Sequence, residues 1–394
     1  MHRVFKQANK RTPSKWRIVG FSLISGVCGI VLPLLMLEIT LRFLPVSTAT
    51  GTVAVDEHNP IVRFTPNQQF VFSKGWHFSI VNAGRINNYG FINDQDYTKH
   101  DAAGPGPVVI IGDSFVEAMI VPYAETVHGR LAKRLSTICP VYSLGISGSQ
   151  LAQYLMFAKY ALTEFHPQAI VFVVVGNDFD ESLTKYRNDP GFHHFQEDPG
   201  THELRLVRTD FKPSLFRRLL RRSALARYLW GTVGIGNIAS RWPPKAEHDV
   251  QYVGNTAAYA SEDRLIDSRR VVDHFFLELS QLVGVQKSRI LFIIDAIRPE
   301  IYSQLDLGRA TGSYFDLMRQ YFLQQATRNG YEAIDMQPRF VFRNRFDGSR
   351  FEFPSDGHWN GLGHEEAADA IASARVLDAL LSCGNRSDLA SIGK

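Results

Sequence analysis

Cysteine is scarce in this chain, with three residues among 394 and no CxxC pair or Cys/His spacing typical of a zinc site. The stretch HEEAA lacks the second histidine of the zinc-binding HExxH pattern. We therefore predict that the protein has no metal site. Cys28 lies in an apolar run, so an oxidising compartment would allow Cys139 and Cys383 to pair. Two separate buried thiols are the simpler expectation.

Acidic residues are absent from the first 17 positions, which carry six of the 43 basic residues. The other 37 basic residues are outnumbered by 39 acidic ones, so the net charge of +4 arises at the N-terminus. A nucleic-acid-binding domain would carry its basic excess on the folded surface, and we predict no nucleic-acid partner. The six residues are Arg3, Lys6, Lys10, Arg11, Lys15 and Arg17.

Charged residues are also missing from Ile18 to Leu37. A helix needs ~20 apolar residues to cross a bilayer, and basic residues before it keep the N-terminus in the cytoplasm. We predict a cytoplasmic tail at 1–17, an anchor in the inner membrane at 18–44, and a periplasmic domain beyond it. A cleaved signal peptide is the alternative, but its apolar region is usually only ~7–15 residues long, and STATGTVA is a poor cleavage site.

Beyond the anchor, an extension of short strands and loops is expected at 45–106 and the main domain at 107–384. An insertion at about 179–260 interrupts this domain, and a short tail follows at 385–394. Apolar strands such as AIVFVVV alternate with helices, which predicts an α/β fold with a parallel sheet covered on both faces. Strands are predicted at 108–111, 141–144, 169–175, 289–294 and 332–336, and helices at 126–136, 150–165, 261–283, 313–329 and 363–381.

Polar or small residues follow several of these strands, at the carboxyl edge where parallel α/β sheets place their sites. The set includes Ser114 after the first strand and DGHWN, with Asp356 and His358, before the last helix. Serine becomes a nucleophile when an imidazole takes its proton and a carboxylate orients that imidazole. An oxyanion would need donors, for which the backbone N–H groups of Ser114 and Gly148 and the Asn177 side chain are candidates.

These blocks resemble the SGNH hydrolases, also called GDSL-like esterases. GDSF at Ser114, SLGISG ending in Gly148, GND with Asn177 and DGHWN with His358 occur in that family's order. The resemblance implies a flavodoxin-like three-layer α/β/α fold and an acyl-serine mechanism without a cofactor. No G-x-S-x-G elbow of an α/β-hydrolase surrounds Ser114.

The last block departs from the usual D-x-x-H spacing, because Asp356 and His358 are separated by one residue. This D-x-H-W form resembles bacterial exopolysaccharide O-acetyltransferases of the alginate type, which face the periplasm. Trp359 would then line an acyl or sugar pocket, although ordinary packing explains it equally well. Asp295, at the end of a strand, is the alternative carboxylate for His358.

Other polar residues have structural interpretations. Asp113 is expected to hold the turn before Ser114, and Asn360 to cap the last helix. His193 and His194 lack ligand spacing and are predicted to lie at the surface. The insertion also contains an amphipathic basic stretch, which either packs on the domain or faces anionic lipid or polysaccharide. Its arginines are Arg217, Arg218, Arg221, Arg222 and Arg227.

The sequence therefore predicts a membrane-anchored serine esterase or O-acyltransferase, most simply an O-acetyl one, acting on an extracytoplasmic glycan. Water as the acceptor would make it a hydrolase, and a sugar hydroxyl would make it a transferase. One alternative is a lipase-like or thioesterase activity on membrane lipids. Another is a non-catalytic scaffold that retains the fold and binds polysaccharide-assembly proteins.

Overall fold

The structure is a computed structural model that describes residues 15–100, 106–215, 220–235, 252–283 and 287–378. Most of the predicted cytoplasmic tail, the C-terminal tail at 385–394, and Arg217 and Arg218 lie outside the described residues. Cys139 is buried, but Cys383 also lies outside them, so the pairing of these two cysteines stays a prediction.

A five-stranded parallel sheet forms the centre of the main domain, in the order β11-β10-β5-β3-β4. Every residue of the four strands other than β11 is buried, as expected of a sheet covered on both faces. The first of these strands in the chain, β3, lies between β4 on one side and β5 on the other. This is the flavodoxin-like arrangement. The strands are β3 (Val108–Gly112), β4 (Val141–Gly145), β5 (Ala169–Val174), β10 (Ile290–Ile294) and β11 (Glu332–Asp335).

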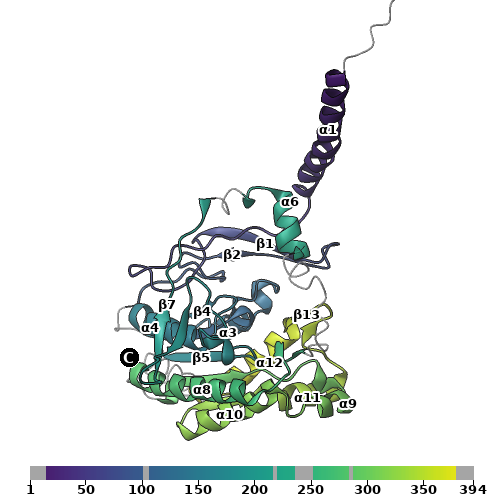
Figure 1. The fold of residues 1–394 in the computed structure, drawn as a ribbon. Coiled ribbons are helices and arrows are strands. Elements are labelled where there is room, and N and C mark those ends of the chain that lie inside the picture. The colour runs from purple at the N-terminus through teal and green to yellow at the C-terminus, as the bar shows by residue number, and fades with distance from the viewer. Residues whose placement is uncertain (1–14, 101–105, 216–219, 236–251, 284–286, 379–394) are drawn as a thin grey trace, which may run out of the picture.

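Helices form a layer on each side of this sheet. On one side α3 contacts α12, and on the other α4 and α10 both contact α8; α8 and α10 run together below β5 in Figure 1. The predicted three-layer α/β/α fold with a parallel sheet is confirmed. These helices are α3 (Val127–Arg134), α4 (Leu151–Phe165), α8 (Glu262–Val283), α10 (Tyr314–Arg328) and α12 (Gly361–Ala372).

The region between β11 and α12 differs from the prediction. It contains α11 (Met336–Asp347) and a hairpin of β12 (Glu352–Phe353) and β13 (Asp356–Trp359), where the sequence suggested a loop. The α11 helix was missed because it buries only Met336 and Phe340, which gives a weak periodic signal. The α12 helix ends at Ala372, and residues 375–378 are helical again after a break at 373–374, so the single helix predicted to reach residue 381 is interrupted; residues 379–381 lie outside the described residues.

Part of the extension and part of the insertion form a second, smaller layer. It includes the hairpin of β1 (Gln68–Lys74) and β2 (Ile80–Ile86), with the π-helical turn η3 (Tyr228–Val233) packed on β1. The insertion also contains β6 (His193–Glu197), β7 (Leu204–Arg208), α6 (Ala224–Arg227), β8 (Tyr252–Val253) and β9 (Thr256–Ala257). Of these, β6 contacts α4 and β9 contacts α10 of the main domain. Short helices elsewhere are α2 (Ser114–Glu117), η1 (Tyr123–Glu125), η2 (Asp180–Ser182), η4 (Lys287–Arg289), η5 (Glu300–Tyr302) and α9 (Gln304–Ala310).

The prediction that His193 and His194 lie at the surface is wrong. Both side chains are buried, and burial lowers the pKa of each imidazole to about 4. His193 Nδ1 lies 3.1 Å from Gln153 Oε1 on α4, so the first strand of the insertion packs onto the main domain. No local pattern predicts this contact, because it joins residues that are 40 positions apart.

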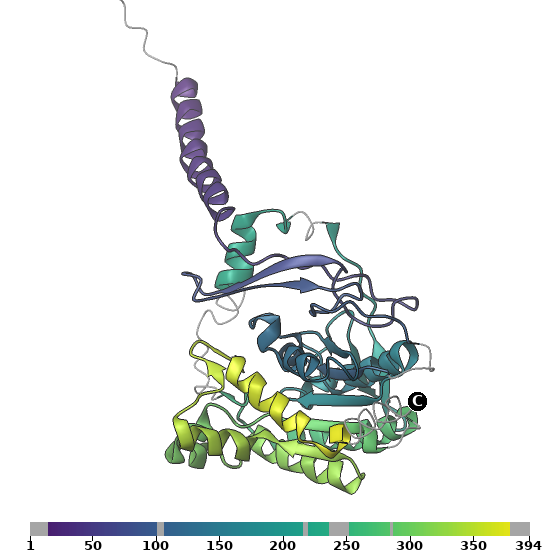
Figure 2. The same cartoon turned by 180° about the vertical axis from the view of Figure 1, so that it is seen from behind.

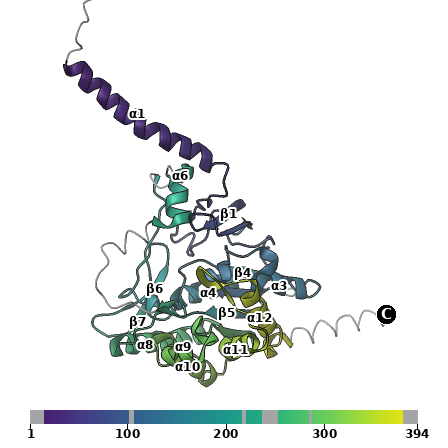
Figure 3. The same ribbon diagram turned by 90° about the vertical axis from the view of Figure 1, so that its right-hand side faces the viewer.

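The N-terminal helix α1 (Lys15–Leu41) extends away from the rest of the molecule (Figures 1 and 3). Residues Val19–Leu41 have a mean hydropathy of 2.2, and this helix is long and apolar enough to span a membrane. Glu38, near its end, accepts hydrogen bonds from the Ala224 and Leu225 N–H groups at 2.9 and 2.8 Å. The helix is thereby joined to the first turn of α6, seen directly below it in Figure 2.

Asn360 caps α12 as the sequence predicts, since its Oδ1 accepts from the N–H groups of Leu362 and Gly363 at 2.9 and 3.0 Å. We expect Asn360→Ala to lower the free energy of unfolding by ~1–2 kcal/mol, because these two donors lose their partner. Asn360→Ser, which keeps an acceptor, should recover part of the loss. Denaturant unfolding of the full chain in detergent measures both; equal stability of Asn360→Ala and the wild type would contradict the prediction.

Candidate active site

Ser114 lies at the carboxyl edge of the sheet because β3 turns sharply into α2. Asp113, rather than Ser114, caps this short helix: its Oδ1 accepts from the Phe115 N–H at 2.9 Å. Gly145 at the end of β4 permits the close approach, because a Cβ there would lie 2.4 Å from the Glu117 backbone nitrogen. Ser114 therefore begins the helix as its first residue and is fixed by the packing of two glycine-ended strands.

His358 reaches Ser114 from the β12–β13 hairpin. Its Nε2 lies 2.7 Å from Ser114 Oγ, and its Nδ1 is hydrogen-bonded to Asp356 Oδ1. The same carboxylate oxygen accepts from the His358 backbone N–H at 2.9 Å. The structure thus brings together the three residues that the sequence proposed as a serine–histidine–aspartate set, although two of them lie on a short strand instead of in a loop.

The charges of this site favour a basic imidazole. Burial alone would lower the pKa of His358, but the hydrogen bond and the charge of Asp356 outweigh it, with Asp113 contributing, and the net shift is upward. Burial would raise the pKa of Asp356, yet hydrogen bonds from His358 and Lys74 hold it well below its usual range. The arrangement keeps Asp356 ionised beside a histidine that readily accepts a proton.

Asp295, the alternative partner for His358, is occupied elsewhere. Its two oxygens accept from Arg298 at 3.0 and 2.6 Å, in a buried pair. It also accepts from the Trp359 indole N–H at 2.8 Å. Trp359 has no exposed surface and packs edge-on against Phe115, so the suggestion that it lines a substrate pocket is wrong. Its indole needs a buried acceptor, and Asp295 supplies it.

The two remaining predicted residues, Gly148 and Asn177, lie near one charged group. Gly148 has φ +86°, and a Cβ there would lie 2.6 Å from an Arg187 guanidinium nitrogen. Arg187 is ion-paired with Glu181, which also accepts from the Asn177 amide at 3.1 Å. The second amide hydrogen of Asn177 has no part in that bond. The role of both residues as oxyanion donors stays a prediction.

Two residues of the site escaped sequence reasoning. Lys74, the last residue of β1, donates to Asp356 Oδ2 from a segment 282 positions away and has no motif around it. Glu117 lies one helical turn beyond Ser114, and burial raises its pKa to about 7. Its carboxylate accepts from the backbone N–H and hydroxyl of Ser147, next to Gly148. An acidic residue shortly after the serine was the only available signal.

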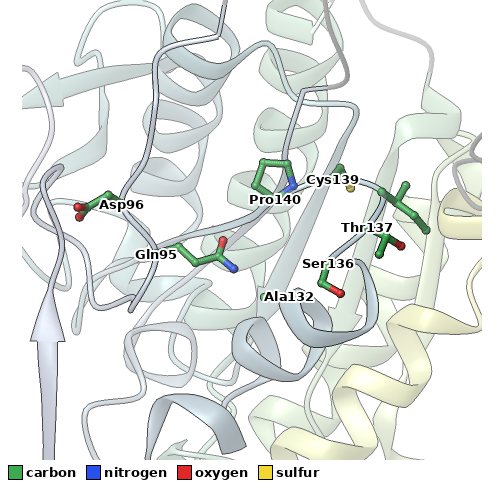
Figure 4. Close-up of a pocket in the computed structure, with 8 residues that line it drawn as sticks. Gln95, Asp96, Ala132, Ser136, Thr137, Cys139 and Pro140 are labelled. Carbon is green, nitrogen blue, oxygen red and sulfur yellow. The ribbon is translucent and has the colours of Figure 1, made fainter.

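The cavity in Figure 4 lies away from this site. It has a volume of about 490 Å³ and is lined in part by the segment that leads into β4. That segment is at the amino end of the strand, whereas Ser114 lies at the carboxyl edge, and none of the residues above lines the cavity. Among the described residues, no group of three or more His, Cys, Asp or Glu side chains is placed to hold a metal ion.

No protein-family model matches this chain, and no curated protein matches it. Solved structures similar to it include a GDSL-like lipase from Bacteroides thetaiotaomicron, which is 14% identical over 70% of this chain and 89% of that one (TM-score 0.32). A phospholipase A1 from Streptomyces albidoflavus is 11% identical over 68% and 99% (TM-score 0.37). A member of the lipolytic G-D-S-L family from Veillonella parvula is 12% identical over 67% and 94% (TM-score 0.30).

The glycine at the end of β4 offers a test of the packing beneath Ser114. We expect Gly145→Ala to lower the free energy of unfolding by ~1–3 kcal/mol, because the added methyl group must displace the α2 backbone. Gly308→Ala in α9 is the matched control: a Cβ there meets nothing within 4 Å, and alanine favours a helix. Unfolding measurements that find Gly145→Ala no less stable than Gly308→Ala would refute this view of the turn.

Proposed function

We propose that the protein is a serine esterase or acyltransferase of the SGNH type, with Ser114 as nucleophile, His358 as general base and acid, and Asp356 as the group that orients His358. The observation that carries this proposal is the pair of contacts made by one imidazole, to Ser114 Oγ at 2.7 Å and to the buried Asp356 carboxylate. A hydroxyl so placed gives its proton to the imidazole as it attacks a carbonyl carbon.

The reaction would proceed through two tetrahedral intermediates. Ser114 Oγ bonds to the ester carbonyl carbon while its proton passes to His358 Nε2. The intermediate collapses, the bond to the leaving oxygen breaks, and His358 returns the proton to that oxygen. Water or a sugar hydroxyl then attacks the acyl-serine, losing its proton to His358, and Ser114 recovers that proton as the acyl group departs.

Asp356 would act through His358. Its Oδ1 holds the Nδ1–H tautomer, which leaves Nε2 free to accept the Ser114 proton, and its charge stabilises the imidazolium formed during attack. The N–H groups of Ser114 and Gly148 and the Asn177 amide are the proposed donors to the oxyanion. The Asn177 bond to Glu181 would fix that amide before substrate arrives.

The substrate we propose is an O-acetyl or other O-acyl group on an extracytoplasmic polysaccharide. Support comes from the apolar α1 helix preceded by basic residues, and from the D-x-H-W form of the last block. Comparing acetate release with acetyl transfer to an oligosaccharide would distinguish hydrolase from transferase. Activity on phospholipid vesicles but not on acetylated glycan would favour the lipase-like alternative.

A serine-reactive fluorophosphonate probe tests the nucleophile. We expect the full chain in detergent to be labelled, and labelling to be lost in Ser114→Ala, because Ser114 is the hydroxyl that contacts an imidazole paired with a carboxylate. Ser136→Ala, in the distant cavity of Figure 4, is the control and should label like the wild type. Labelling that persists in Ser114→Ala rejects Ser114, and an unlabelled wild type favours the scaffold alternative.

The pH dependence follows from the raised pKa of His358. Only the neutral imidazole accepts the Ser114 proton, so kcat/KM should fall as the pH drops through a value above the ordinary ~6.5. In Asp356→Asn the charge that raises this pKa is gone, so the acid limb should move to lower pH while the plateau falls by about 10⁴. The measurement is kcat/KM for an activated acetyl ester across pH; a wild-type limb at or below ~6.5 would count against the assignment.

A further inference from the structure

The Asp356 carboxylate is divided between two partners from different layers of the molecule. Oδ1 serves His358, and Oδ2 accepts a hydrogen bond from Lys74 Nζ. The Asp356 side chain is only 5% exposed, whereas that of Lys74 is 44% exposed. These two bonds restrain rotation of the Asp356 carboxylate, because turning the group would break the bond to His358 or the bond to Lys74.

We propose that Lys74 is a positioning residue for the Ser114–His358–Asp356 set, and that the second, smaller layer, which carries it, is part of the active site. The proposal rests on the proposed function and adds to it a residue outside the four sequence blocks. Lys74 touches neither Ser114 nor His358 in the hydrogen bonds of the site; it would act through Asp356.

Thr232 of the insertion contacts the residues on both sides of Lys74, while Ser47 Oγ accepts from the Ser73 backbone N–H at 2.9 Å. Ser73 Oγ lies 2.9 Å from Thr232 Oγ1, both being buried, and the Gly75 N–H donates to the Thr232 carbonyl at 2.9 Å. Thr232 belongs to η3, which packs on β1. The lysine therefore extends from a hairpin end whose two flanking residues are held, and its ammonium group reaches Asp356 from a defined point.

That layer is itself joined to the apolar N-terminal helix. The η3 turn continues directly from α6, whose first turn is bound by Glu38 of α1. Tyr228 Oη also donates to the Trp76 carbonyl at 2.6 Å, which ties the hairpin turn to the same segment. Figure 3 shows α1, α6 and β1 in succession above the sheet. Residues far from Ser114 in the chain are thus connected to its triad through hydrogen bonds, the continuous α6–η3 segment and the Lys74–Asp356 ion pair.

The charge of Lys74 also offsets the carboxylates near His358. Asp113 and Asp356 both favour the imidazolium, and Lys74 opposes them. Removing Lys74 should therefore raise the pKa of His358, and the free Asp356 oxygen should loosen the imidazole. The titratable and charged groups around His358 are Asp356, Lys74, Asp113, Glu117, Arg298 and His364.

Lys74→Met tests both consequences, with Lys74→Arg as the charge-retaining variant. Lys99→Met removes an exposed lysine that is ion-paired with Glu164 and is the matched control. We expect Lys74→Met to lower kcat about tenfold, a small part of the ~10²–10⁴ that general acid–base catalysis contributes, with little change in KM. Its acid limb should move to higher pH, while Lys74→Arg and Lys99→Met keep the wild-type limb.

Three outcomes separate the possibilities. A wild-type pH profile in Lys74→Met overturns the proposal. An equal loss of kcat in Lys74→Met and Lys74→Arg, without a shift of the acid limb, also overturns it, because the lysine is then merely structural.

Fluorophosphonate labelling is measured in the same samples. If the wild type is labelled and Ser114→Ala is not, either of these results rejects only the role of Lys74, and the proposed function stands. Thermal unfolding of each variant shows whether a loss of kcat comes from misfolding. If Lys74→Met is misfolded, the pH profile of Lys74→Arg is used for the test instead.

Thr232→Val examines the layer without touching the triad. It removes the hydroxyl that contacts Ser73 and accepts from the Ser47 N–H at 3.3 Å, but keeps the carbonyl that holds Gly75. We expect a shift of the acid limb in the same direction as in Lys74→Met, and smaller, since the hairpin is loosened while the lysine remains. Thr327→Val, at an exposed position of α10, is the control. An unshifted profile in Thr232→Val would overturn the role of this layer.

Discussion

The arrangement of this site depends on the Asp356 carboxylate, which is almost completely removed from water. Burying the Asp356 charge is costly unless hydrogen bonds and opposite charge compensate for it. The compensation comes from the His358 backbone and ring and from Lys74. The need to satisfy one buried group therefore brings the β12–β13 hairpin and the β1–β2 hairpin to the same place, and the imidazole is oriented as a result.

The parts of the site that could be predicted from the sequence are those fixed locally or by the sheet. Asp356 and His358 are two positions apart, so a bond between them needs only a short extended segment. Ser114 follows an apolar strand, and the carboxyl ends of parallel strands lie along one edge. The alternation of apolar strands with helices was likewise enough for the three-layer fold, since each strand buried on both faces must be apolar throughout.

The rest depended on contacts between distant segments that leave no local pattern. Lys74 lies in a polar extension with nothing to mark it, and its partner is decided by how the hairpin packs. Choosing between Asp295 and Asp356 required knowing that Arg298 and Trp359 occupy the former. The same pairing explains why Trp359 is buried: a tryptophan beside a candidate catalytic motif resembles a substrate contact until its indole N–H is seen to have an internal acceptor.

The two halves of the candidate triad are held with different firmness. Ser114 stands on the central sheet, where Gly145 lets the strand and the α2 backbone approach so closely that the turn cannot move without disturbing the core. His358 and Asp356 stand on a two-stranded hairpin, and such hairpins are only marginally stable by themselves. Asn360 bonds across its base to the Arg350 and Glu352 carbonyls, and Arg298 binds Glu352 on β12 and the Gly357 carbonyl on β13. Lys74 adds a third restraint from outside the domain. A disturbance of any one of these restraints should move His358 relative to Ser114 while the sheet stays intact. The reactivity of Ser114 is therefore the more sensitive measure of changes in the hairpin. The free energy of unfolding is the more sensitive measure of changes in the β3–α2 turn.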